Sequence, residues 1–372
     1  MKISIDARGI NWYKGTGIGT YTENILKYMI NKNSNYFFNI YWAGGNYNNF
    51  KKHNTNILLT SKKYSRFFEQ CYFPNNINKL KPDIYHIPQN GIGLCENINC
   101  KIVVTIHDLI PYIMPETVGK GYLNKFLREM PKIMYLSDKI ITVSQHSKND
   151  ILKFFPMDEK KVKVIPLAAG KKYKPLEKNK CLNLLKHKYK IDCPFILYIG
   201  GFSPRKNVKS LIISFSKIYN KLQNKYKLVI IGAKKDEGNK LLELTNKLKI
   251  ASNIIFTDFV PEKDLPIFYN ACSAFVYPSL YEGFGLPPLE AMSCGAPVIT
   301  SNTSSIPEVV GNSCITIDPL NTDDMINSLE NLLNNEALQR KLSKNGYERS
   351  KLFSWEKTSK LTLDLYNELY KN

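Results

Sequence analysis

The stretch Tyr281-Glu-Gly-Phe-Gly-Leu-Pro-Pro-Leu-Glu-Ala-Met292 decides the fold, because it carries the chain from a strand through a loop into a helix. A run of β-forming residues, Ala274–Tyr277, precedes it, and its glycines mark a tight loop. Pro287 and Pro288 suit the first turn of a helix, where a missing N–H costs nothing. A strand, a glycine loop and a helix in this order are typical of a parallel α/β sheet.

The same alternation of short β-rich runs and longer amphipathic stretches occurs twice along the chain. A segment rich in Pro, Gly and charge, Pro166–Pro194, separates the two series. We therefore predict two doubly wound α/β domains, over 1–175 and 190–353, with a helix over 355–372 that can pack back on the first. The predicted strands are Lys2–Asp6, Phe37–Trp42, Ile84–Ile87, Ile102–Ile106, Lys139–Val143 and Val162–Ile165, then Phe195–Ile199, Lys227–Ile231, Ile254–Thr257, Ala274–Tyr277, Pro297–Thr300 and Cys314–Ile317.

Composition indicates an ordered, cytosolic protein. Asp6 and Arg8 follow the start too early for a signal peptide, and no apolar run approaches the roughly 20 residues that span a bilayer. The 8 cysteines form no C-x-x-C pair, which favours reduced thiols over disulfides or a zinc site. The net charge of +20 is spread along the chain; it fits either a drift toward lysine or attraction to anionic membranes and phosphorylated ligands. No nucleic-acid-binding motif accompanies the charge.

The opening stretch also carries candidate binding groups. Glu282 lies in the loop and Glu290 is expected in the first turn of the helix, so the two carboxylates can hold separate hydroxyl groups of a sugar joined to a ribose. The amides of Phe284, Gly285 and Leu286 are expected at the carboxyl ends of the strands, where open α/β sheets bind ligands. Either glutamate taken singly is equally compatible with a helix that places acid against its dipole.

A second loop, Gly200-Gly-Phe-Ser-Pro-Arg-Lys-Asn207, follows the predicted strand Phe195–Ile199 and opens a helix. Arg205 and Lys206 on such a loop supply fixed positive charge together with backbone amides, which suits a diphosphate. An exposed basic turn is the alternative for this segment. No D-x-D carboxylate pair, the usual holder of a divalent ion on a diphosphate, occurs in the sequence.

The glutamate segment resembles the E-x7-E signature of glycosyltransferase family 4, whose members are retaining enzymes of GT-B fold with two domains facing each other across a cleft. The resemblance continues through Cys294–Thr300 and Ser304–Val309. It implies that Glu282 contacts the transferred sugar and Glu290 the ribose, and that the loop amides bind sugar hydroxyls. Arg205 and Lys206 would then hold the diphosphate without a metal, Arg205 standing in for the arginine that many members place at the position of Gly201.

The resemblance also assigns roles in the first half of the chain. His107, in Thr-Ile-His-Asp-Leu, matches the family's histidine that contacts the donor sugar, and His86 is expected to be structural. Gly15-Thr-Gly-Ile-Gly19 is too short for the full dinucleotide fingerprint, but the family uses this loop near donor and acceptor. Gly17 and Gly19 are the candidates for close backbone approach. Asp108 is expected to orient the loop or to cap a turn.

The resemblance is strongest to mannosyltransferases, which makes GDP-mannose the first expectation for the donor and a glycan or lipid-linked molecule the acceptor. Phe259 and Val260 are candidates for contact with the base. Lys62-Lys-Tyr-Ser-Arg-Phe-Phe68 mixes cations and aromatics, and we expect a helix that packs its aromatics on the sheet rather than a membrane contact. The alternatives for function are a GT-B epimerase or phosphorylase, and a basic, non-enzymatic polyanion-binding protein.

Overall fold

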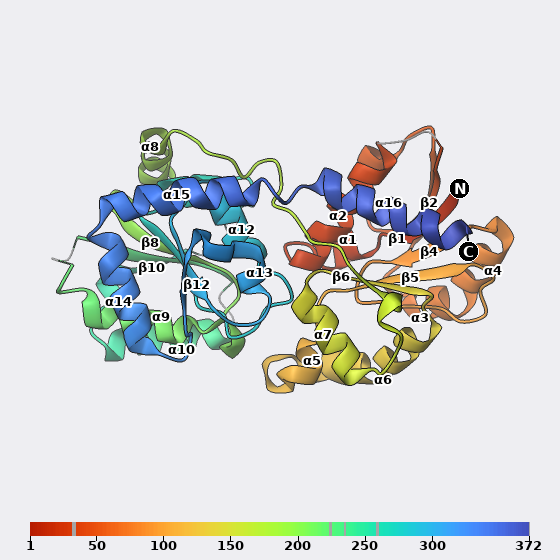
Figure 1. The fold of residues 1–372 in the computed structure, drawn as a ribbon, viewed down its shortest axis with the longest axis horizontal. Helices are drawn as coiled ribbons and strands as arrows, with labels where there is room; N and C mark the ends of the chain where they lie inside the picture. The colour runs from red at the N-terminus through yellow and green to blue at the C-terminus, as the bar shows by residue number, and fades with distance from the viewer. Residues whose placement is uncertain (32–34, 223–224, 234–235, 258–259, 372) are drawn as a thin grey trace. The chain divides into compact units, whose positions relative to one another are not determined.

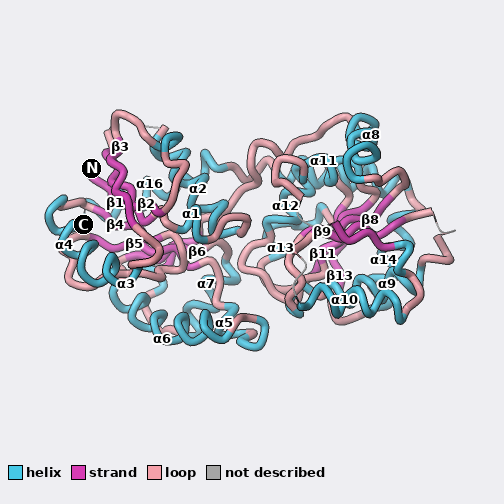
Figure 2. Tube along the Cα trace, turned by 180° about the vertical axis from the view of Figure 1, so that it is seen from behind, coloured by secondary structure: helices cyan, strands magenta, loops and turns pink. Residues whose placement is uncertain are grey.

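The computed structural model describes residues 1–31, 35–222, 225–233, 236–257 and 260–371 (Figure 1). The chain divides into unit 1, Met1–Ala168 with Phe353–Asn372, and unit 2, Ala169–Leu352. Each unit is built on one sheet whose strand pairs are all parallel. Figure 2 shows each sheet between layers of helices. The predicted pair of doubly wound α/β units is confirmed.

The sheet of unit 1 has the strand order β3-β2-β1-β4-β5-β6-β7. Thr55–Thr60 forms β3, a strand that the sequence did not predict. It lies at the edge of the sheet and is only half-buried, and polar residues flank an apolar run of three residues, which is shorter than the runs of the central strands. The strands are β1 (Lys2–Asp6), β2 (Phe37–Ala43), β3 (Thr55–Thr60), β4 (Ile84–Ile87), β5 (Lys101–Ile106), β6 (Lys139–Thr142) and β7 (Val162–Val164).

The helices of unit 1 include the last helix of the chain, α16, which packs against α2 (Figure 1). Tyr366 on α16 reaches the sheet, where its hydroxyl hydrogen-bonds Nδ1 of His86 at 2.6 Å. The apolar face of α16 is buried, and this contact anchors the helix in unit 1. The helices are α1 (Gly9–Trp12), α2 (Gly17–Ile30), α3 (Ser65–Phe67), α4 (Phe73–Leu80), α5 (Ile110–Ile113), α6 (Lys120–Leu136), α7 (Gln145–Phe154) and α16 (Trp355–Lys371), with short η1 (Asn48–Phe50), η2 (Phe68–Tyr72), η3 (Pro115–Thr117) and η4 (Glu159–Lys161).

The sheet of unit 2 has the strand order β10-β9-β8-β11-β12-β13. Its central strands β8 and β11 are fully buried and apolar, as expected for a sheet covered on both faces. The strands are β8 (Phe195–Ile199), β9 (Lys227–Ile231), β10 (Ile254–Thr257), β11 (Ala274–Tyr277), β12 (Val298–Ser301) and β13 (Ile315–Ile317). The helices are α8 (Lys178–Tyr189), α9 (Val208–Ile218), α10 (Asp236–Lys247), α11 (Leu265–Ala271), α12 (Leu286–Ser293), α13 (Ile306–Val310), α14 (Thr322–Leu333) and α15 (Glu336–Ser350), with η5 (Pro204–Lys206), η6 (Ala251–Asn253) and η7 (Gly311–Ser313).

Two local expectations need correction. The segment 169–175, placed in the first domain, belongs to unit 2, because Tyr173 packs in the same core as Cys181 and Leu185 of α8. The aromatics of the 62–68 segment do not all pack on the sheet: Tyr64 and Phe67 are each 55% exposed, and only Phe68 packs against the core. One turn of α-helix followed by the π-helix η2 replaces the single helix that we expected.

The strand orders define where each unit can bind a ligand. In unit 1 the order reverses between β1 and β4, and in unit 2 between β8 and β11. At such a point the connections leave the sheet in opposite directions and open a crevice outside the carboxyl ends of the strands. The loops after β8 and β11 carry Arg205, Lys206 and Glu282, so the sheet itself brings these residues together. Among the described helices, none is both long and apolar enough to cross a membrane.

Candidate active site

Glu282 is the centre of a charged cluster in unit 2. Its Oε1 atom accepts hydrogen bonds from Lys206 Nζ at 2.6 Å and Ser279 Oγ at 2.5 Å, and it lies 2.8 Å from Arg205 Nη1. Tyr277 donates to the same oxygen at 3.0 Å and accepts from Lys206 at 2.6 Å. Burial opposes ionisation of Glu282, but Lys206 and Arg205 outweigh it and lower the pKa of Glu282 to about 2. The carboxylate is therefore charged at neutral pH.

Backbone contacts lock the two loops of this cluster together. Arg205 and Lys206 lie on η5, after β8, and Glu282 lies after β11. The Leu280 amide donates to the Arg205 carbonyl at 2.8 Å, and Ser279 Oγ donates to the same carbonyl at 3.2 Å. The Arg205 guanidinium also donates to the carbonyl of Tyr281. Because β8 and β11 are neighbours in the sheet, residues that are far apart in sequence form one rigid site.

Glu290 occupies a different environment on α12. The expectation that it lies in the first turn is wrong, because α12 begins at Leu286 and Glu290 is its fifth residue. Its Oε2 accepts from the Tyr269 hydroxyl at 3.2 Å, and Tyr173 also hydrogen-bonds the carboxylate. Burial dominates here and raises the pKa of Glu290 to about 7, although the two tyrosine hydroxyls and the charge of Lys172 act in the opposite direction. Glu290 therefore titrates near neutral pH.

The loop between the two glutamates owes its shape to glycine and to two serines. Gly285 precedes α12 with a φ of +116°, a conformation that favours glycine. Ser305 donates to the carbonyls of Glu282 and Phe284 at 2.8 and 2.9 Å. Ser304 Oγ accepts from the Glu282 amide at 3.0 Å. Phe284 is buried and Leu286 starts the helix, so the predicted loop residues line the same turn.

Val260 is buried in the apolar core of unit 2, and Phe259 lies outside the described residues. Three residues of the site were not predicted from the sequence as functional: Tyr277, Ser279 and Tyr269. Tyr277 and Ser279 lie within five residues of Glu282, so their closeness along the chain was a usable signal. Tyr269 comes from α11, and only the packing of α11 against α12 brings it to Glu290.

His107 lies in unit 1 at the end of β5, with its ring edge on Tyr21 at a centroid distance of 4.9 Å. Its Nε2 lies 2.9 Å from the Pro88 carbonyl, which only accepts, so Nε2 carries the proton and Nδ1 is the acceptor. Burial lowers the pKa of His107 to about 4, although the hydrogen bond to Pro88 opposes this effect. The imidazole is neutral at pH 7, and it can orient a hydroxyl group without adding charge.

The glycine loop of unit 1 differs from expectation. Gly17 and Gly19 already belong to α2, and Gly15 is the residue with positive φ, at +79°. A Cβ atom at Gly19 would lie 2.3 Å from the Tyr13 carbonyl oxygen, so this glycine permits a close approach within the chain itself. Close packing against Tyr13 is thus sufficient to explain why position 19 is a glycine, without any contact with a ligand.

Two residues near His107 have the structural surroundings that we expected of them. The His86 ring contacts Thr105 Oγ1 at 2.8 Å through Nε2 and Tyr366 through Nδ1. Burial lowers the pKa of His86 to about 3. Asp108 Oδ1 accepts from the Ile110 amide at 3.1 Å and caps the turn that starts α5.

The described residues contain no group of three or more His, Cys, Asp or Glu side chains that could hold a metal ion. The positive charge beside Glu282 comes from Arg205 and Lys206, whose side chains are 13% and 15% exposed. Such a desolvated pair can bind the oxygens of a diphosphate, and the adjacent Glu282 can accept hydrogen bonds from hydroxyl groups.

Comparisons with known proteins place this geometry in a family. Residues 16–168 match the family model "Glycosyltransferase Family 4", and residues 185–349 match "Glycosyl transferases group 1". The O-antigen chain mannosyltransferase B of Escherichia coli is 33% identical over 294 residues, covering 79% of this chain and 76% of that protein. The Escherichia coli serotype-specific mannosyltransferase WbdA is 32% identical over 74% of this chain, which spans 34% of WbdA.

The fold matches solved structures over its whole length. Anabaena HepE, solved in complex with UDP and glucose, has a TM-score of 0.77 and 16% sequence identity, covering 99% of this chain and 100% of that one. At this identity the likeness concerns the fold alone. With the two family models and the related mannosyltransferase, the chain belongs to glycosyltransferase family 4 and is a glycosyltransferase of GT-B fold.

Proposed function

We propose that unit 2 binds a nucleoside-diphosphate sugar, with GDP-mannose as the donor. The observation that carries this proposal is the convergence of Arg205 and Lys206 on one buried site at the β8–β11 switch point. Two fixed cations suit the two phosphates of the donor. The printed names of the relatives, mannosyltransferases of Escherichia coli, favour mannose as the sugar.

In this proposal Glu290 accepts hydrogen bonds from the ribose, and Glu282 together with His107 orients the sugar. Phe284, Gly285 and Leu286 lie along the sugar, and Gly17 and Gly19 lie near the donor phosphates. The role of Glu290 fits its surroundings, because a carboxylate bonded only to tyrosine hydroxyls gains from two further donors. Val260 remains the candidate for contact with the base.

The reaction that we propose is a metal-independent transfer with retention of configuration. The bond between the anomeric carbon and the phosphate oxygen breaks, and an acceptor hydroxyl forms a bond on the same face of that carbon. Arg205 and Lys206 stabilise the charge on the departing diphosphate, which accepts the proton of the acceptor hydroxyl. This arrangement needs neither a divalent ion nor a protein nucleophile.

The acceptor that we propose is a glycan, free or lipid-linked, in the synthesis of a surface polysaccharide, because the Escherichia coli relative at 33% identity is named an O-antigen chain mannosyltransferase. The net charge of +20 supports contact with an anionic membrane at its inner, cytoplasmic face. Sedimentation with phosphatidylglycerol vesicles but not with phosphatidylcholine vesicles would support this contact, and equal behaviour with both would contradict it.

The experiment for the donor is a thermal-shift screen with GDP, UDP, dTDP and ADP, repeated with EDTA. We expect GDP to raise Tm most, with the same shift in EDTA, because ligand binding to the folded state stabilises it. Turnover of GDP-mannose with a mannose-terminated oligosaccharide, followed by NMR of the new anomeric proton, then tests transfer and stereochemistry. No Tm shift with any nucleotide at millimolar concentration, or a shift that EDTA abolishes, would contradict the proposed site.

A further inference from the structure

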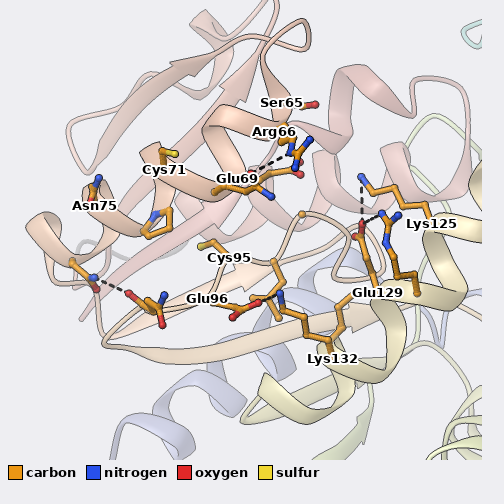
Figure 3. Close-up of a pocket in the computed structure, with 18 residues that line it drawn as sticks. Ser65, Arg66, Glu69, Cys71, Asn75, Cys95, Glu96, Lys125, Glu129 and Lys132 are labelled. Atoms are coloured by element: carbon orange, nitrogen blue, oxygen red, sulfur yellow. Dashed lines mark hydrogen bonds and ion pairs between the residues drawn. The ribbon is translucent and has the colours of Figure 1, made fainter.

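Unit 1 contains a cavity of about 1130 Å³ (Figure 3). Its walls come from the segment 65–78, from the loop 93–97 after β4, and from one face of α6. This volume lies at the upper end of the range for ligand sites, and it exceeds what a single sugar ring would fill. The cavity adjoins Arg8, which follows β1, through Gly93. The corner of the cavity at Gly93 therefore lies near the switch point between β1 and β4.

Glu69 lies in the cavity wall, and its carboxylate is held in a fixed position by a buried arginine. The Arg8 side chain, fully buried, binds Asp6 through Nε at 2.8 Å and Nη2 at 2.6 Å, and its Nη1 donates to Glu69 Oε1 at 3.1 Å. The guanidinium also lies over the rings of Trp12 and Phe73, at 4.4 and 4.6 Å. Arg8 is thus fixed from three sides, and it fixes the carboxylate of Glu69 in turn.

Gly93 keeps this corner of the cavity open. A Cβ atom there would lie 2.8 Å from Arg8 Nη2 and 2.9 Å from Glu69 Oε1. Its φ of +95° independently favours glycine. Any side chain at position 93 would displace the contact between Arg8 and Glu69, so glycine at this position preserves the geometry of the cavity wall.

The charges on the walls define the ligand class. Cations and anions lie side by side: Lys125 and Arg128 are 4.0 and 3.2 Å from Glu129, and Lys132 pairs with Glu96 (Figure 3). Arg66 is a fourth cation of the wall and donates to the neutral Gln70 at 3.2 Å, so the four cations face three carboxylates, those of Glu69, Glu96 and Glu129. Paired charges of both signs create little net potential, so they do not select a polyphosphate. Side chains that donate and accept side by side suit a ligand whose hydroxyl groups do both.

We propose that this cavity binds the saccharide of the acceptor, with Glu69 accepting hydrogen bonds from its hydroxyl groups. The proposal rests on the proposed function and adds the place and the residue by which the acceptor is recognised. The ligand is an uncharged oligosaccharide longer than one sugar. Glu69 determines acceptor specificity and Arg8 positions it.

Cys71 provides a direct probe of occupancy. It lines the cavity and, of the eight cysteines, is the one classed as exposed. We would measure its modification by iodoacetamide with mass spectrometry, in the presence of mannose, mannotriose or maltotriose. Mannotriose is expected to slow the reaction at least fivefold, and mannose to slow it much less. Equal modification rates with and without every sugar at 20 mM, in protein whose cooperative melting verifies that it is folded, would overturn the proposal.

Glu69→Gln tests the recognising residue. The amide oxygen still accepts from Arg8, so the fold is retained, but a neutral group binds hydroxyls less strongly. We expect KM for the oligosaccharide acceptor to rise about tenfold, while kcat, GDP affinity and acceptor-independent hydrolysis of GDP-mannose stay unchanged. Glu159→Gln, which removes an ion pair with Lys148 outside the cavity, is the matched control.

The outcomes separate the two proposals. If Glu69→Gln leaves the acceptor KM unchanged while GDP still binds, the cavity proposal fails and the proposed function stands. If GDP and GDP-mannose do not bind even to the unmodified protein, the donor proposal fails instead, and protection of Cys71 by mannotriose still decides the cavity. If Glu69→Gln shows no cooperative melting transition, Glu69→Asp takes its place. The aspartate shortens the side chain and is also expected to raise the KM for the acceptor.

Discussion

The ion pairs of Glu282 predict that this carboxylate competes with the diphosphate for Arg205 and Lys206. In the protein without donor, both cations contact Glu282 Oε1, at 2.8 and 2.6 Å. A diphosphate that takes these cations leaves Glu282 buried beside negative charge. Replacing it by glutamine should therefore tighten binding of GDP, the product, even though the same residue contributes to transfer.

The pKa of Glu282 sets the magnitude. Burial raises it and the two cations lower it, so that it falls from 4.5 to about 2. At about 1.4 kcal/mol for each pKa unit, the carboxylate gains roughly 3 kcal/mol from its surroundings. Loss of that net gain on GDP binding corresponds to about 300-fold, and partial retention of the contacts gives about tenfold. We expect GDP to bind Glu282→Gln at least tenfold more tightly, while the transfer rate falls.

Isothermal titration of GDP at pH 7.5 measures this effect, with folding verified by Tm. Glutamine keeps an oxygen for Ser279 and Tyr277, so the loop can retain its shape. The control is Glu330→Gln, which removes the surface ion pair with Lys221 and should leave GDP affinity unchanged. Equal or weaker GDP binding by Glu282→Gln would refute the reasoning, because it would mean that the cations bind phosphate without losing their contact with Glu282.

Three further predictions follow from other contacts. Ribose hydroxyls bind the ionised form of Glu290, whose pKa is about 7, so GDP-mannose should bind about tenfold more weakly at pH 6 than at pH 8. Titration calorimetry should find no such pH dependence in Glu290→Gln, and a pH dependence that persists in this variant would contradict the prediction. Gly285→Ala forces a side chain into a φ of +116° and should lower Tm by about 4 °C; an unchanged melting curve would contradict this. Tyr366→Phe removes the hydroxyl that contacts Nδ1 of the buried His86 and should cost about 1–2 kcal/mol in urea unfolding, whereas a cost below about 0.3 kcal/mol would mean that α16 is anchored by apolar packing alone.

The pH dependence for Glu290 has a defined sign. Its pKa is raised in the folded protein, so between about 4.5 and 7 the folded state holds a proton that the unfolded state has lost. Stability therefore falls as pH rises through that window. Donor binding, which requires the charged form, becomes stronger through the same window. GDP-mannose is the suitable ligand, since its phosphates do not titrate in this range.

Much of the fold was predictable from local sequence. Central strands such as Phe195–Ile199 and Ala274–Tyr277 are continuous apolar runs, and their bounds were predicted without error. The edge strand Thr55–Thr60 was missed because a half-buried strand needs fewer apolar side chains. The helical position of Glu290 was misplaced by less than one turn, since Pro287 marks a helix start but not its first residue.

The sequence by itself determined which residues could carry the chemistry: two glutamates, an arginine and a lysine on loops after strands. It could not determine their protonation states, because Arg205 and Glu282 are far apart along the chain and come into contact only through the pairing of β8 with β11. The two glutamates show the difference most plainly. Tertiary structure surrounds Glu282 with cations and Glu290 with tyrosine hydroxyls, so one pKa falls to about 2 and the other rises to about 7. Charge and burial act through space, and only the folded chain sets those distances.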